Sequence, residues 1–160
     1  MDAGQPAAAA DKHYCRLPVP EMTEYVLHEP NVLLLDKAEF ALDDGAYHPA
    51  EELLRADNIL RAELGWPSRR GAVAQPWSVP AEIAEHHVRL RFTIHAECAV
   101  SGAELAMEDA ELAIVTLNGE AVSAQAEGWF VDKSIRRMKL PALCEGTNTL
   151  EITLDRKSVV

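Results

Sequence analysis

Three pairs of adjacent carboxylates are the residues that a hydrolytic mechanism would use first: Asp43-Asp44, Glu51-Glu52 and Glu108-Asp109. A general acid and a general base must face each other across a substrate. Neighbouring residues on a strand point to opposite faces, so these pairs do not converge. The pattern favours a turn for the first pair, a helix start for the second and a loop for the third. We therefore predict no catalytic residues and no enzyme activity for this chain alone.

The histidines and serines do not complete another kind of catalytic centre. His87 and His95 share a face of an alternating segment with Arg89 and Arg91, and a cationic neighbourhood disfavours a divalent ion. A zinc site would also need a third ligand at a suitable spacing. The sequence has neither a G-x-S-x-G elbow nor a glycine-rich phosphate loop. We expect the histidines to be exposed to solvent.

The tryptophans are the residues best suited to bind a ligand. An indole ring can stack on the apolar face of a pyranose while polar groups at its rim bond the hydroxyls. Trp129 follows Gly128 and lies near Asp132, whereas Trp66 and Trp77 lie in a proline-rich stretch. The alternative is that all three rings pack the helix and this stretch against the rest of the domain.

The overall composition excludes several classes of function. The length of 160 residues is that of one domain, and the 48% apolar content is typical of a globular protein. The net charge of −11 would repel a phosphate backbone, so we expect no nucleic-acid partner. No apolar run approaches the length of a membrane span, and we expect no membrane partner.

The three cysteines, Cys15, Cys98 and Cys144, are an odd number without close spacing. They predict neither a disulfide framework nor a zinc site, and we interpret Cys98 and Cys144 as small buried thiols next to strands. Reduced thiols fit a cytoplasmic location, and the start of the chain has no signal peptide, but the location stays open. Residues 1–28 are interpreted as a flexible leader.

Residues 29–80 combine a strand, a helix and a proline-rich connection. Residues 31–42 end in an alternating pattern that predicts a strand, and Asp43-Asp44-Gly45 predicts a turn. Apolar residues then recur at helical spacing from Pro49 to Leu64. Proline suits the first helical turn and Gly65 suits the residue after the last, so we expect the helix over this range.

Residues 81–157 predict the core of a β-sandwich. Residues 88–95 and 149–155 alternate between apolar and polar side chains, as half-buried strands do. Shorter strands are expected at 104–107, 112–117, 120–123 and 129–132. Asn118-Gly119 predicts a tight hairpin, and residues 136–143 favour a short irregular or helical segment. We therefore predict a mainly β fold, an antiparallel β-sandwich with one N-terminal helix, as a single domain over residues 29–160.

The order of these motifs resembles a known family. The segments are Leu90–Ala96, Leu117–Val122, Gly128–Asp132, Leu140–Leu143 and Glu145–Ile152. They resemble the galactose-binding-like jelly roll that forms the sugar-binding domain of glycoside hydrolase family 2 and related large bacterial glycosidases, including rhamnosidase-like ones. Residues 29–31 and 64–67 also look like a segment found before such a sandwich.

The resemblance implies an accessory role. In such enzymes the catalytic carboxylates lie on a separate (β/α)8 barrel, which needs roughly 250 residues and cannot fit in this chain. The expected partners are the catalytic domain of the same polypeptide and a glycan, and the expected ligand contacts are Trp129, Asp132 and Asn118. Such sandwiches often carry calcium, for which Glu108, Asp109 and Asp155 are weak candidates, although no calcium-loop spacing supports them and no cofactor is the first expectation.

Three functions remain open at this point. The first is a non-catalytic accessory module of a glycoside hydrolase-like protein, which packs against its neighbour and binds carbohydrate weakly. The second is a free-standing carbohydrate-binding protein, which requires exposed aromatic side chains on its surface. The third is a structural or assembly module without a ligand, which requires an exposed apolar patch.

Overall fold

A computed structural model describes residues 28–66, 68 and 85–156 of the chain. The chain divides into two units, residues 1–33 and 34–160. In the first unit the described residues 28–33 are exposed and form neither helix nor strand. Residues 1–27 of the predicted leader and most of the proline-rich connection, Trp77 included, lie outside the described residues.

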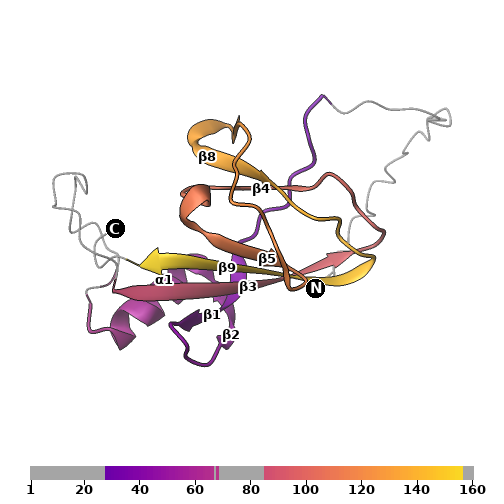
Figure 1. The fold of residues 1–160 in the computed structure, drawn as a ribbon. Coiled ribbons are helices and arrows are strands. Elements are labelled where there is room, and N and C mark those ends of the chain that lie inside the picture. The colour runs from indigo at the N-terminus through magenta and orange to yellow at the C-terminus, as the bar shows by residue number, and fades with distance from the viewer. Residues whose placement is uncertain (1–27, 67, 69–84, 157–160) are drawn as a thin grey trace, which may run out of the picture. The chain divides into compact units, whose positions relative to one another are not determined.

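The larger of two antiparallel sheets has six strands in the order β2-β1-β3-β9-β5-β6. Its centre is the pair β3 and β9, which runs without interruption from His86 opposite Arg156 to Ala96 opposite Gly146 (Figure 1). The strands are β1 Lys37–Leu42, β2 His48–Glu52, β3 His86–Ala96, β5 Ile114–Leu117, β6 Glu120–Ala121 and β9 Gly146–Arg156.

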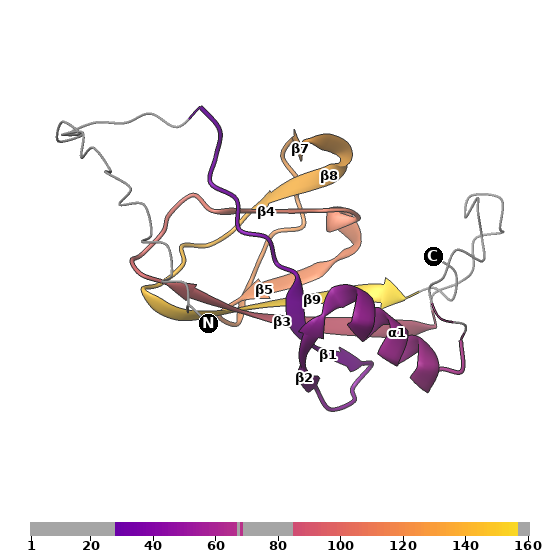
Figure 2. The same cartoon turned by 180° about the vertical axis from the view of Figure 1, so that it is seen from behind.

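The smaller sheet has three antiparallel strands in the order β4-β8-β7. They are β4 Glu104–Met107, β7 Trp129–Phe130 and β8 Asp132–Lys139. In both views β4 and β8 lie over the larger sheet (Figures 1 and 2). Leu105 of β4 and Met138 of β8 belong to the same buried cluster as Phe92 and Leu150 of the larger sheet. The fold is therefore mainly β, with antiparallel sheets on a common core, as the alternating segments predicted.

One face of the larger sheet is apolar because alternate residues of each strand point the same way. Phe40 lies opposite Leu90, and Leu90 lies opposite Ile152, so these three side chains share that face. Two elements cover it. The smaller sheet packs over Phe92 and Leu150, and the helix α1, Leu53–Glu63, packs over Phe40 and Val88 (Figure 2). Burying each large apolar side chain contributes about 1.5–3 kcal/mol.

The helix begins later than the sequence predicted. Pro49 does not open it, because residues 48–52 form β2 and pair with β1, with the His48 ring stacked on Phe40 at 4.7 Å. Instead the Glu52 side chain accepts a hydrogen bond from the Leu54 N–H, which caps the first turn. The helix then ends before Gly65, whose φ of 68° fits the predicted left-handed position.

Other predictions of local structure also need correction. The strand expected over residues 31–42 is confined to Lys37–Leu42. The segment expected to be irregular or helical from Arg136 is instead part of strand β8, because Met138 lies opposite Leu105 and is fully buried. Cys98 and Cys144 are exposed rather than buried, since both lie just outside the paired ends of β3 and β9.

No helix in the described part of the chain is long and apolar enough to cross a membrane.

Candidate functional site

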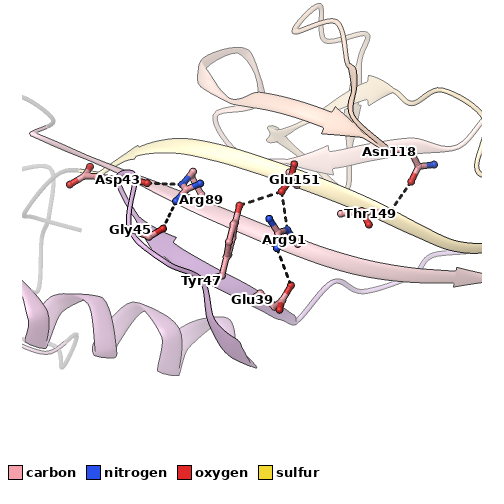
Figure 3. Close-up of polar contacts among 9 residues, drawn as sticks. All are labelled: Glu39, Asp43, Gly45, Tyr47, Arg89, Arg91, Asn118, Thr149 and Glu151. Atoms are coloured by element: carbon pink, nitrogen blue, oxygen red, sulfur yellow. Dashed lines mark hydrogen bonds and ion pairs between the residues drawn. The ribbon is translucent and has the colours of Figure 1, made fainter.

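The open face of the larger sheet carries a cluster of charged residues around Tyr47 (Figure 3). The Arg91 guanidinium carbon lies 3.7 Å from the centre of the Tyr47 ring, and that of Arg89 lies 4.9 Å away. The Tyr47 hydroxyl donates to Glu151 Oε1 at 3.3 Å. Burial first, and the nearby Glu151 carboxylate second, raise the pKa of Tyr47 above its ordinary value, so the phenol stays protonated and remains a donor.

The two arginines of this cluster are bound within the chain. Arg91 Nε donates to Glu151 Oε1 at 2.9 Å, and a second guanidinium nitrogen lies 3.6 Å from Glu39 Oε2. The bond to Glu151 raises the pKa of Arg91 above its ordinary value. Arg89 donates to the carbonyl oxygens of Asp43 and Gly45. These contacts hold the β1–β2 loop on the sheet, so the arrangement serves the fold.

The two adjacent histidines at the start of β3 each have a carboxylate partner. His86 Nδ1 lies 2.8 Å from Asp43 Oδ2, and His87 Nδ1 lies 2.9 Å from Asp155 Oδ1. The Asp43 carboxylate also accepts the backbone N–H of His87 at 2.8 Å. This bond, and next the bond from His86, lower the pKa of Asp43 below its ordinary value of 3.8. The histidines thus tie the ends of neighbouring strands together.

The smaller sheet differs, because its β7–β8 hairpin exposes apolar side chains. Trp129 has 49% of its surface exposed, and Val131, in the turn, has 78% exposed. Val131 has a φ of 61°, which is rare and strained for a β-branched residue. Strain of this kind costs on the order of 1–3 kcal/mol and concentrates at functional sites. No local pattern in the sequence predicts this conformation, since valine is not a turn residue.

Polar side chains of β8 lie beside Trp129. Asp132, Ser134 and Arg136 alternate along the strand. Arg136 lies directly opposite Trp129 and Asp132 lies opposite Phe130, with a shift of register between the two pairs. Asp132 Oδ1 accepts the backbone N–H and the hydroxyl of Ser134, both at 2.8 Å. These bonds lower the pKa of Asp132 below its ordinary value. Asp132 is therefore an ionised acceptor at neutral pH.

Two acidic residues that follow β4, Glu108 and Glu111, contact these side chains of β8. Ser134 Oγ lies 3.4 Å from Glu108 Oε1, and Arg136 Nε donates to Glu111 Oε1 at 3.1 Å. One hydroxyl proton cannot serve both Asp132 and Glu108, so a Glu108 oxygen has acceptor capacity to spare. We call this set, Trp129, Asp132, Ser134, Arg136, Glu108 and Glu111, the Trp129 site. It combines an exposed ring with acceptors and a donor.

Two of the three ligand residues predicted from the sequence, Trp129 and Asp132, are close together in the β7–β8 hairpin. Asn118 lies in the larger sheet, in the β5–β6 turn, where its φ of 53° and that of 82° at Gly119 form the predicted hairpin. Its Oδ1 accepts the Thr149 N–H at 2.8 Å and its Nδ2 donates to Asn148 Oδ1 at 2.9 Å. These bonds give Asn118 a role in joining strands.

The calcium candidates are divided in the same way. Glu108 and Asp109 follow β4, whereas Asp155 lies on β9 and pairs with His87. Among the described residues no three His, Cys, Asp or Glu side chains are grouped so that they could hold a metal ion.

The rest of the Trp129 site was missed because it comes from separate segments. Ser134 and Arg136 lay in a stretch expected to be partly irregular, and Glu111 lies 25 residues from its partner Arg136. Only the pairing of β4 with β8, which places Met107 opposite Arg136, brings these segments together. Alternation along a correctly assigned β8 is the one signal that could have placed Arg136 beside Asp132.

Comparisons with known proteins give no match: no family model, no curated protein and no solved structure is similar to this chain.

Proposed function

We propose that this chain is a non-catalytic β-sandwich module of the jelly-roll type, an accessory part of a glycoside hydrolase-like protein, that binds carbohydrate weakly at the Trp129 site. The observation that carries the binding proposal is the half-exposed indole of Trp129 in one hairpin with the hydrogen-bonding groups of Arg136 and Asp132. The resemblance of the strand and turn motifs carries the link to glycosidases.

The chemistry of the Trp129 site fits a pyranose. The indole face offers an apolar platform for ring C–H groups. Asp132 is ionised and Glu108 has spare acceptor capacity, so both accept hydroxyl protons. The Nε of Arg136 is bound to Glu111, and its guanidinium has further N–H groups that could donate. A site with one exposed ring and few polar groups buries little of a sugar, which agrees with weak binding.

Packing against a neighbouring domain is the second part of the proposal. Large apolar side chains are exposed at Leu112, which follows Glu111 in the chain, and at Ile114 of β5, on the open face of the larger sheet; they are 70% and 69% exposed. Exposure of such side chains to water is unfavourable. Their burial under a partner would therefore favour association. The partner that we propose is the catalytic domain of the same polypeptide.

Intrinsic tryptophan fluorescence tests the binding proposal. The purified chain is titrated with mono- and oligosaccharides up to millimolar concentration, with and without calcium. We expect a saturable change with one sugar class, lost in Trp129→Ala and weakened in Asp132→Ala. Trp66→Phe is the matched control and should keep the response, because Trp66 contacts His86 of the larger sheet instead.

A response that persists in Trp129→Ala would place any sugar elsewhere and overturn the assigned site. The absence of a response to every sugar, in a variant set that stays folded by circular dichroism, would favour a ligand-free structural or assembly module. The exposed Leu112 and Ile114 are the observation that supports that second candidate. The third candidate is a free-standing carbohydrate-binding protein. A saturable response, together with a natural protein that has no catalytic domain attached, would favour it.

A further inference from the structure

Two exposed cysteines lie on the connections between the two sheets: Cys98 between β3 and β4, and Cys144 between β8 and β9. Cys98 lies two residues after the end of β3, and Cys144 lies two residues before the start of β9. In Figure 1 the end of β3 and the start of β9 lie side by side, where one chain segment leaves toward β4 and the other returns from β8. Both thiols are free in this structure.

The pairing on both sides of the cysteines brings their two segments together. On one side Ala96 pairs with Gly146, and two steps along each segment from this pair lead to Cys98 and Cys144. On the other side Val100 pairs with Leu143 through two backbone hydrogen bonds, of 3.0 and 2.9 Å. The two segments are therefore held together before and after the cysteines.

The spacing suits a disulfide. Residues directly opposite in an antiparallel pair have Cα atoms about 4.5–5.5 Å apart, within the range of roughly 4.4–6.8 Å that disulfides use. The segment from Ala96 to Val100 contains one residue more than the segment from Leu143 to Gly146, as in a β-bulge. Bends at Glu97, Cys98 and Glu145 accompany this extra residue, and both cysteines are exposed there.

The backbone around Cys144 is fixed by a buried side chain. Asn148 is fully buried; its Oδ1 accepts the Cys144 N–H at 2.9 Å and its Nδ2 donates to the Cys144 carbonyl at 2.8 Å. A bond to Asn118 Nδ2 holds the same Asn148 oxygen in place. Since one cysteine is held rigidly, the pair meets with little loss of conformational freedom.

We propose that Cys98 and Cys144 form a reversible disulfide when a low-molecular-weight disulfide oxidant is present. The thiolate of one cysteine attacks a sulfur of the oxidant and releases one small thiol. The second cysteine then attacks the mixed disulfide and releases the other small thiol. Overall, two protein thiols are oxidised to one S–S bond, and one small disulfide is reduced to two thiols with the transferred protons.

The bond would close a loop that contains the whole of the smaller sheet. All strands from β4 to β8, and with them the Trp129 site, lie between Cys98 and Cys144. Closing so long a loop restricts the unfolded chain and stabilises the folded state. For a domain of this size the rise in Tm should be on the order of 5–15 °C.

The test uses a Cys15→Ser background, which leaves two cysteines, and incubates the folded protein with oxidised glutathione. We expect loss of both thiols, an intact mass lower by two hydrogens with no glutathione attached, and a linked Cys98–Cys144 peptide. Dithiothreitol should restore the thiols and the lower Tm. The matched controls add Cys98→Ser or Cys144→Ser; each should take up one glutathione and show no rise in Tm.

Two outcomes would overturn the proposal. One is a folded Cys15→Ser protein that carries a glutathione on each cysteine and no internal linkage. The other is a linkage that forms only between two chains or only after unfolding, which would show that the two segments do not bring the thiols together.

Discussion

The charged cluster around Tyr47 and the Trp129 site contain the same kinds of side chain and differ in how those side chains are bound. Around Tyr47 both arginines have partners within the chain, and the ring lies against the guanidinium groups. At the Trp129 site the ring is half exposed and Glu108 shares a single serine hydroxyl with Asp132. The arginines around Tyr47 therefore already have their hydrogen-bond partners within the chain.

This difference separates a structural network from a candidate ligand site. Polar groups that are already satisfied gain little by exchanging their partners for a ligand. Groups that point to water next to an exposed ring can gain contacts at small cost. If both sheets belong to one stable unit, they should unfold together when the shared core is weakened.

The largest effect is expected from removing core side chains in each sheet. Leu150→Ala in the larger sheet and Met138→Ala in the smaller one each remove a fully buried side chain of the same cluster. Each should lower the free energy of unfolding by about 2–5 kcal/mol. Urea unfolding, followed by circular dichroism and by tryptophan fluorescence, should show one shared transition for each variant.

Two separate transitions, with Met138→Ala shifting only one of them, would show that the smaller sheet unfolds independently. The Trp129 site would then lie on a less stable region, and its exposure would reflect local opening instead of a formed surface.

A smaller effect of opposite sign is expected from Val131→Gly. Glycine adopts a φ of 61° without the clash that valine has, so the variant should gain about 1 kcal/mol of stability. Val131→Asn is the matched control, because asparagine tolerates this conformation better than valine but keeps a side chain. Thermal unfolding monitors both variants. A loss of stability in both would show that Val131 makes a contact worth more than its strain.

The smallest effect is expected from Asp43→Asn, and it should depend on pH. The folded-state pKa of Asp43 lies below its ordinary value of 3.8, so its ionised form contributes stability above that value and loses it as pH falls through the folded-state pKa. Since the carboxylate is largely exposed, the effect should be small. The variant should unfold at a slightly lower urea concentration at pH 7 and at the same concentration as the parent near pH 2. An equal difference at both values would exclude ionisation as the cause.

Long alternating segments and glycine turns were predictable because their causes are local. The alternation over residues 88–95 and 149–155 appears as β3 and β9, and Asn118-Gly119 forms a hairpin with two positive φ angles. Gly65 ends the helix for the same reason. In each case the side chain, or its absence, restricts the backbone without help from distant residues.

Other segments were predicted wrongly because a distant partner decides their structure. Pro49 is compatible with a helix start, but pairing with β1 places it in β2. Residues 136–139 alternate poorly, yet burial of Met138 against β4 makes them a strand. Strand propensity is weak next to such tertiary contacts. Exposure of Cys98 and Cys144 was missed for the same reason, since bends outside the paired region decide it.

By itself the sequence determined the mainly β fold class, the positions of the two long strands β3 and β9, and the hairpin at Asn118. The ligand contacts at Trp129 and Asp132 stay a prediction. Only the tertiary structure decided that Asn118 joins strands apart from them, that Glu108 and Glu111 contact Ser134 and Arg136, and that the segments of Cys98 and Cys144 run side by side. The reason is that local backbone preferences act over a few residues, whereas a site or a cysteine pair depends on strand pairing between segments far apart in the chain.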